Sequence, residues 1–185
     1  MKNKQENHDA DTPSLLNQSL GGRVNRCFGC GPANEHGLKL RFSLDHEAGT
    51  STAKVKLARR YEGPPGHIHG GIIATLLDEA MGKVNKIHNV VAMTRHIEID
   101  YLRPSPLSQL LTVTGRFLRR DGRKMFMESE IHDAAGKLLV RGKGLFIVID
   151  PAAFFAKHSK ERVSAACPVA VPAPKARAAR KQRVP

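Results

Sequence analysis

The chain has 185 residues, of which 41% are hydrophobic, and carries a formal net charge of +13 at pH 7. That length supports one domain with a real hydrophobic core, but not comfortably two. No apolar run approaches the roughly 18 residues of a transmembrane helix. The N-terminal residues 1–9 also lack the apolar stretch of a secretory signal. We therefore expect a cytoplasmic protein with no membrane partner.

The positive charge is concentrated at the C-terminus. Five basic residues and no acidic residue lie within the last eleven: Lys175, Arg177, Arg180, Lys181 and Arg183. We expect residues 151–185 to form an extension that ends in a disordered basic tail, and residues 1–20 to be flexible. An arm that binds nucleic acid is the alternative function of this tail. It is the less favoured one, because no aromatic residues interleave with the charges.

The cysteines are Cys27, Cys30 and Cys167, an odd number that argues against a disulfide framework. The spacing of Cys27 and Cys30 is half of a zinc ribbon, with no second pair, although His36 could join it. We expect a turn with two small, partly buried thiols, no metal site and no cofactor.

Apolar and polar residues alternate with the period of a β-strand in six stretches. Two of these precede residue 60 and read as a hairpin, and four follow residue 89. The short turns between successive strands make antiparallel neighbours. The expected strands are residues 37–44, 50–57, 90–102, 110–118, 123–132 and 137–149. Together with one apolar helix they predict an α+β domain over residues 21–150, with a twisted sheet wrapped around the helix.

The expected helix begins near Gly70, after the loop-forming run Glu62-Gly-Pro-Pro-Gly66, and ends near Lys86. Its apolar residues fill half of the helical circle. The other half carries small residues with one carboxylate, Asp78, among them. A face of this kind indicates close approach by another backbone, a second copy of the helix or a ligand. A purely structural role for the helix is the alternative interpretation.

The glycines at the start of this helix have a chemical consequence. The first N–H groups of a helix lack internal partners and carry partial positive charge. With no side chain at Gly70 or Gly71, an oxygen atom can approach them. A developing oxyanion could be stabilised there, with a carboxylate two turns away. The combination suits hydrolysis of an ester or thioester.

The sequence Tyr61-Glu-Gly-Pro-Pro-Gly-His-Ile-His-Gly-Gly-Ile-Ile-Ala-Thr-Leu-Leu-Asp78 resembles the hotdog-fold acyl-CoA thioesterases of the PaaI-like group. The resemblance extends to Cys27-Phe-Gly-Cys-Gly-Pro, Met93-Thr94 and Ile99-Asp-Tyr-Leu-Arg-Pro104. It implies an antiparallel sheet wrapped around a central helix, and a homodimer or dimer of dimers with active sites at the interface. It also implies acyl-CoA as the substrate.

The resemblance further implies roles for individual residues. Asp78 is the catalytic acid, acting as general base or nucleophile from the partner subunit, and the Gly71 N–H polarises the thioester carbonyl. His69 orients the carbonyl or the loop, and Thr94 helps to hold the attacking water. Gly63 stands where many relatives have an amide side chain. The expected substrate-binding residues are Gly70, Thr75 and Arg95, the last as one of several basic residues available for coenzyme A phosphates.

Two other functions stay open on the sequence. One is non-catalytic binding of acyl-CoA by a sensor or partner module. The other, ranked lower, is a hydratase or dehydratase on the same fold, because those enzymes have a different arrangement of histidine and acid. Each individual residue also has a plainer interpretation: His69 as a helix cap, Thr94 as an ordinary strand residue, and Glu79 as peripheral.

Overall fold

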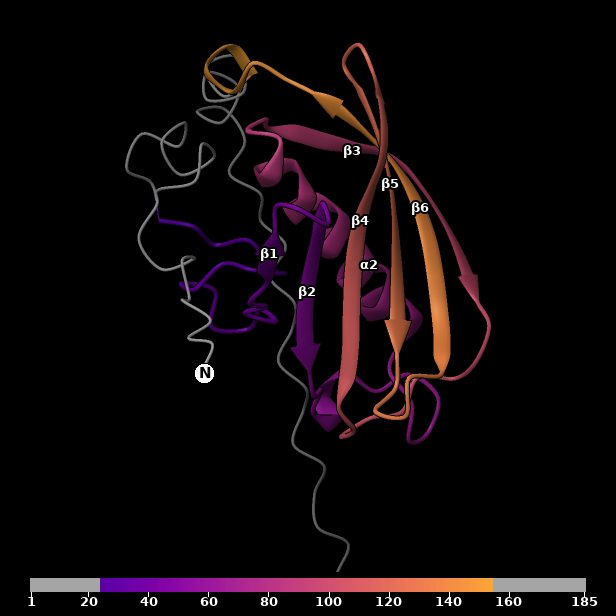
Figure 1. The fold of residues 1–185 in the computed structure, drawn as a ribbon. Coiled ribbons are helices and arrows are strands. Elements are labelled where there is room, and N and C mark those ends of the chain that lie inside the picture. The colour runs from indigo at the N-terminus through magenta and orange to yellow at the C-terminus, as the bar shows by residue number, and fades with distance from the viewer. Residues whose placement is uncertain (1–23, 155–185) are drawn as a thin grey trace, which may run out of the picture.

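A computed structural model of the chain describes residues 24–154 (Figure 1). The predicted flexible segment 1–20 and almost all of the predicted basic extension lie outside this range. No helix within the described range is long and apolar enough to cross a membrane.

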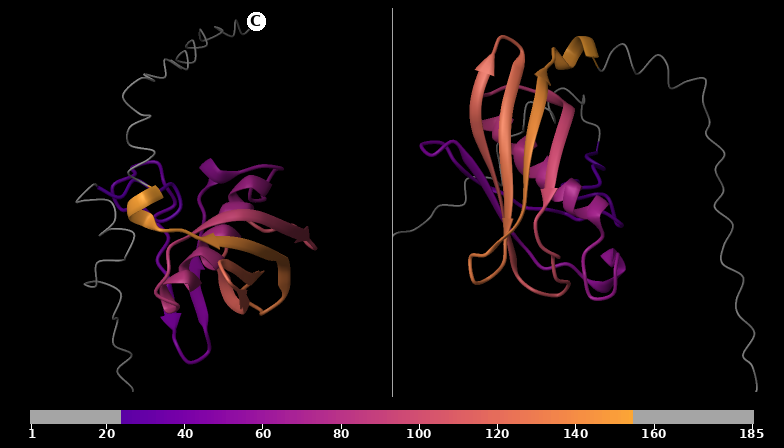
Figure 2. Two further views of the ribbon diagram at one scale, coloured as in Figure 1. Left: turned by 90° about the horizontal axis from the view of Figure 1, so that it is seen from above. Right: turned by 90° about the vertical axis from the view of Figure 1, so that its right-hand side faces the viewer.

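Six antiparallel strands form one sheet in the order β1-β2-β4-β5-β6-β3. The sheet curls around a single long helix, α2 (Gly70–Ile87), so that the helix lies in its concave face (Figures 1 and 2). The strands are β1 (Ser43–Asp45), β2 (Thr50–Val55), β3 (Ala92–Tyr101), β4 (Leu111–Asp121), β5 (Lys124–His132) and β6 (Leu138–Val148). The predicted α+β hotdog architecture is confirmed.

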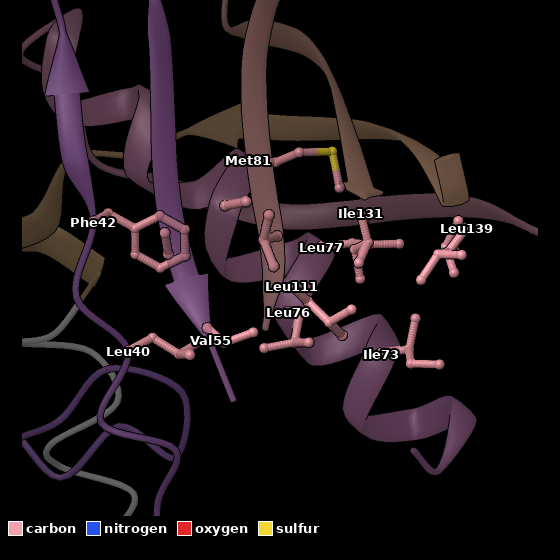
Figure 3. Packing of buried hydrophobic residues seen from close by; sticks show 14 of the residues in the cluster. Leu40, Phe42, Val55, Ile73, Leu76, Leu77, Met81, Leu111, Ile131 and Leu139 are labelled. Carbon is pink, nitrogen blue, oxygen red and sulfur yellow. The ribbon is translucent and has the colours of Figure 1, made fainter. Parts of the chain in front are cut away.

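The core lies between α2 and the concave face of the sheet (Figure 3). The apolar half of the helix is buried there, including Leu76, Leu77, Met81 and Val84, none of which is exposed. These residues recur at helical spacing, so one stripe of α2 meets the sheet. The hydrophobic periodicity of the sequence therefore predicted correctly which face of the helix is buried.

The helix backbone approaches β4 and β2 unusually closely at Ala80. A Cβ atom at Gly115 of β4 would lie 2.4 Å from the Ala80 carbonyl oxygen. The same carbonyl accepts a 2.6 Å hydrogen bond from the buried Ser51 hydroxyl. A glycine and a small hydroxyl thus fix the depth at which α2 sits, and with it the position of Asp78 two residues earlier.

The first predicted strand is shorter than expected. Residues 37–44 were predicted to pair throughout, but only Ser43–Asp45 pairs with β2. The backbone N–H groups of Leu38 and Leu40 instead donate to the carbonyls of Phe28 and Gly29. Lys39 between them has a φ of 51°, which interrupts extended backbone. This part of the chain is therefore hydrogen-bonded to the cysteine-containing turn and does not extend the sheet.

β3 is an edge strand, hydrogen-bonded to β6 alone among the described strands. Its register shifts between Thr94 and His96, which marks a β-bulge. Ala92 lies on the helix side before the shift, and Ile97 and Ile99 lie on that side after it. The extra residue in the bulge changes which alternate positions face α2. Thr94 consequently faces the helix together with Ile97 and Ile99, although an even-numbered and an odd-numbered residue of a regular strand would point to opposite sides.

Candidate active site along helix α2

The loop before α2 is a tight hairpin that delivers His69 to the helix start. Glu62 and Ile68 form an isolated antiparallel bridge, and the Glu62 carboxylate accepts a 2.8 Å hydrogen bond from the Gly66 N–H. A Cβ atom at Gly63 would lie 2.8 Å from the Cα of His69. A side chain at this position would collide with the His69 backbone, so the loop conformation requires glycine here.

His69 is the N-cap residue of α2, which bears out its plainer interpretation as a helix cap. Its Nδ1 accepts a 3.0 Å hydrogen bond from the Gly71 N–H. Because Nδ1 accepts, the proton of the neutral imidazole lies on Nε2. The side chain is exposed, so this second nitrogen can donate to a group outside the chain.

The N–H groups at the helix start are not equivalent. Those of Ile72 and Ile73 both donate to the His69 carbonyl, and that of Gly71 donates to the His69 ring. The Gly70 N–H has no hydrogen-bond partner within residues 24–154. We predicted Gly71 as the donor to a thioester carbonyl. The structure instead leaves the Gly70 N–H available, because the His69 ring already occupies that of Gly71.

Asp78 lies two turns along the helix and is half-buried. Its Oδ1 accepts a 2.8 Å hydrogen bond from the Thr94 hydroxyl of β3. Burial raises the pKa of the Asp78 carboxyl above its ordinary value, the Thr94 hydrogen bond opposes that rise, and the nearby Glu79 charge adds to it. The net result is a carboxyl group whose pKa is shifted upward, as suits a general base working near neutral pH.

Within one chain, the Gly70 N–H and the Asp78 carboxylate are too far apart to act on the same carbonyl group. Asp78 follows Gly70 by eight residues, which is about 12 Å along a helix axis. A carbonyl group is only about 1.2 Å long, so its oxygen and its attacked carbon lie side by side. A Gly70 N–H and an Asp78 carboxylate that serve the same thioester therefore come from different copies of the helix.

The predicted substrate-binding residues occupy different positions. Thr75 is half-buried, and its hydroxyl donates to the Gly71 carbonyl oxygen at 3.0 Å. Arg95 is exposed in the bulge of β3, next to Thr94.

Sequence reasoning missed Tyr101, whose hydroxyl donates a 3.0 Å hydrogen bond to the Gly70 carbonyl oxygen. Tyr101 alternates with Ile97 and Ile99 in the sequence, and that periodicity is the signal that could have found it.

Glu79 is not peripheral, contrary to the sequence interpretation. Its carboxylate accepts a hydrogen bond from the Cys27 thiol at 3.1 Å and lies 3.6 Å from the Lys83 ammonium.

Of the two thiols predicted to be partly buried, Cys30 is half-buried and Cys27 is exposed, and neither forms a disulfide. Burial raises the pKa of the Cys30 thiol to about 12. A protonated thiol is a poor nucleophile, so Cys30 is not suited to attack a thioester.

Comparison with known proteins places this fold and helix in a defined group. A sequence model described as "Thioesterase superfamily" matches residues 65–140, which include the end of the loop, the helix and strands β3, β4 and β5. The crystal structure of RHA08564, a thioesterase superfamily protein, is 34% identical in sequence. The match covers 75% of this chain and 68% of that one, with a TM-score of 0.64. This chain belongs to the thioesterase superfamily.

Among curated proteins, the acyl-coenzyme A thioesterase THEM4 of Rattus norvegicus is 36% identical over 91 residues. The match covers 49% of this chain and 39% of THEM4, so the chain spans about two fifths of the length of this relative.

Two more distant solved structures share the fold. The PaaI protein of E. coli is 21% identical, with a TM-score of 0.57 over 61% of this chain and 81% of that one. A protein of Streptococcus pneumoniae described as a hypothetical thioesterase, whose crystal structure was determined with coenzyme A, is also 21% identical, with a TM-score of 0.55 over 59% of this chain and 87% of that one. The resemblance to the PaaI-like group is thereby confirmed at the level of the fold.

Proposed function

We propose that this protein hydrolyses acyl-CoA thioesters to free acid and coenzyme A. The observation that carries the proposal is the pairing of a partly buried carboxylate, Asp78, with an unoccupied N–H at a helix start, Gly70. The first can activate water and the second can stabilise an oxyanion. The name of the THEM4 relative and the coenzyme A bound to the streptococcal structure support this substrate class.

The active site in this proposal is shared between two copies of the chain. The unpaired edge of β3 carries a ready set of backbone donors and acceptors, and the exposed Met93 and Tyr101 lie on this strand. An edge of this kind pairs readily with a second strand. Antiparallel pairing of β3 with its copy gives a two-fold dimer, in which Asp78 of one chain faces Gly70 of the other.

The reaction in such a site needs one water molecule and no cofactor. The Asp78 carboxylate, oriented by Thr94, takes a proton from water as the water oxygen attacks the thioester carbonyl carbon. The carbonyl electrons move to its oxygen, which accepts a hydrogen bond from the Gly70 N–H. The oxyanion electrons then re-form the carbonyl and the C–S bond breaks. The departing sulfur takes the proton from Asp78, so coenzyme A leaves as the thiol and the Asp78 carboxylate is restored. In this scheme His69 orients the carbonyl or the loop through its Nε2 proton.

Arg95 is the basic residue that we assign to the coenzyme A moiety. It is exposed next to Thr94, and no hydrogen bond or ion pair occupies its guanidinium group among the described residues. A guanidinium group binds phosphate in a bidentate manner.

The direct test is a free-thiol release assay with acyl-CoA substrates of increasing chain length and with aryl-CoA. We expect release of coenzyme A to saturate with substrate concentration for at least one acyl class. Thermal stabilisation by an acyl-CoA without any thiol release would refute hydrolysis and would favour the non-catalytic binding module.

A further inference from the structure

A cluster of metal-ligating side chains lies beside α2 and takes no part in the proposed reaction. The Sγ atoms of Cys27 and Cys30 and a carboxylate oxygen of Glu79 all lie within 4.8 Å of one another. The thiols come from the turn that precedes the sheet, whereas Glu79 follows Cys27 by 52 positions on the helix. Sequence spacing could not reveal the third member, which is why no metal site was predicted.

The backbone of the turn is built to bring these three groups together. Gly31 donates its N–H to the Cys27 carbonyl at 2.9 Å, and a Cβ atom there would lie 2.4 Å from the Cys27 nitrogen. A Cβ atom at Gly29 would lie 2.4 Å from the side chain of Glu79. Both glycines are therefore required for the turn to close tightly and to approach the carboxylate.

The charges around the cluster favour one divalent cation. The side chains of Glu79 and Lys83 are only 14% and 19% exposed, and their charged ends lie 3.6 Å apart. Two thiolates, one carboxylate, one ammonium group and a divalent cation sum to zero. A neutral set of this kind avoids the large cost of an uncompensated buried charge.

We propose that Cys27, Cys30 and Glu79 bind one Zn²⁺ ion that fixes the cysteine turn to helix α2. Two sulfur ligands and one oxygen ligand suit zinc, which prefers Cys, His and carboxylate ligands in tetrahedral geometry. At ordinary zinc–ligand distances the donor atoms of such a site are about 3.5–3.8 Å apart. The 3.1 Å between Cys27 Sγ and Glu79 Oε1 needs only a small adjustment.

The cluster can be reached from solvent on the side of Cys27. Cys27 is exposed, so the ion can enter from solvent, and water can complete the tetrahedron. His36, the other residue considered from the sequence, is not part of the cluster. Glu79 neighbours Asp78 and its charge contributes to the raised pKa of that carboxyl. The proposed reaction needs no metal ion, so failure of the zinc site would leave the thioesterase proposal unaffected.

The test uses the full chain, reduced and stripped of metal, with Co²⁺ as a spectroscopic probe. We expect one Co²⁺ per chain, a thiolate-to-cobalt charge-transfer band in the near ultraviolet and the visible bands of a tetrahedral ion. Zn²⁺ should displace the cobalt, bleach these bands and raise the melting temperature. C27S, C30S and E79Q should each weaken binding by at least about 100-fold. C167S and E47Q are matched controls that should bind as the unmodified chain does.

Far-UV circular dichroism of each metal-free variant separates loss of a ligand from loss of the fold. The cobalt spectrum of the unmodified chain tests the proposal even where a variant does not fold. The proposal is overturned if that spectrum lacks the thiolate band, or if folded C27S and C30S bind Zn²⁺ as tightly as the controls do. A Cys27–Cys30 disulfide whose reduction gives no metal uptake would equally overturn it.

Discussion

Thr94 Oγ1 donates a 2.8 Å hydrogen bond to Asp78 Oδ1, which joins the edge strand to the carboxylate of the central helix. The bond depends on the bulge between Thr94 and His96, which turns Thr94 toward α2. It lowers the pKa of a carboxyl group that burial raises. The hydroxyl therefore keeps Asp78 ionised over a wider pH range and restricts its rotation.

Replacement of Thr94 by Val should remove the hydrogen bond to Asp78 while keeping the β-branched shape of the side chain. Without the hydrogen bond the pKa of Asp78 rises further, so the acid limb of the kcat–pH profile should move to higher pH. At neutral pH we expect kcat to fall roughly tenfold, the value of one hydrogen bond to a charged group. T94S retains a hydroxyl and should keep the original profile. Identical profiles for T94V and T94S would contradict the role of the bond.

Replacement of Asp78 by Asn should abolish general-base catalysis and lower kcat by about 10²–10⁴-fold, with a smaller effect on KM. Thiol release under saturating acyl-CoA is the measurement. E47Q, a change on the exposed residue Glu47 in the turn between β1 and β2, is the matched control and should leave turnover unchanged. Turnover of D78N equal to that of E47Q would remove Asp78 from the mechanism.

The same D78N variant should be more stable than the unmodified chain at neutral pH. The pKa of Asp78 is raised in the folded state from its ordinary value of 3.8. The folded chain therefore binds more protons than the unfolded chain just above that value, and stability falls as pH rises through this window. Asn carries no charge, so D78N removes the free-energy cost of holding a charged carboxylate at this partly buried position. Melting temperatures measured from pH 4 to pH 8 should diverge as pH rises, and a difference independent of pH would contradict the explanation.

A mixture of two inactive variants tests the shared site. H69A damages the helix start and D78N damages the carboxylate, so each homodimer is expected to be nearly inactive. In a two-fold mixed dimer, one site combines His69 from the D78N chain with Asp78 from the H69A chain. Random exchange of equal amounts should restore about a quarter of the original activity. The mixture is refolded from denaturant and assayed. Activity no higher than that of the separate variants would place the whole site in one chain.

Alanine at each of the two glycines distinguishes the two N–H groups. A Cβ atom at Gly70 would lie 3.7 Å from the Tyr101 ring, an ordinary contact, whereas one at Gly71 would lie 3.2 Å from His69 Nδ1. G70A should fold with unchanged or slightly higher stability, and its methyl group should hinder the carbonyl at the free N–H and lower kcat/KM. G71A should displace His69 from the cap and cost about 1 kcal/mol of stability. Equal melting temperatures for the two variants would contradict this distinction.

The sequence by itself determined the elements whose causes are local or periodic. Helical spacing from Ile72 to Val84 predicted the buried stripe of α2, and alternation predicted the strands to within a few residues. The motif from Tyr61 to Asp78 predicted the family and the fold. The first strand was overestimated because alternation in residues 37–44 could not report the positive φ of Lys39 or the hydrogen bonds of Leu38 and Leu40 to the turn.

Only the tertiary structure decided which groups meet. A one-residue bulge turned Thr94 to the helix, against the parity set by Ile97 and Ile99, and no periodicity contains that information. The cap formed by His69 occupied the Gly71 N–H and left that of Gly70 open, which depends on the rotamer of one ring. Glu79 met Cys27 across 52 positions because two glycines let a turn close onto α2. Chain pattern sets what each element is, whereas packing sets which of its polar atoms remain available for chemistry.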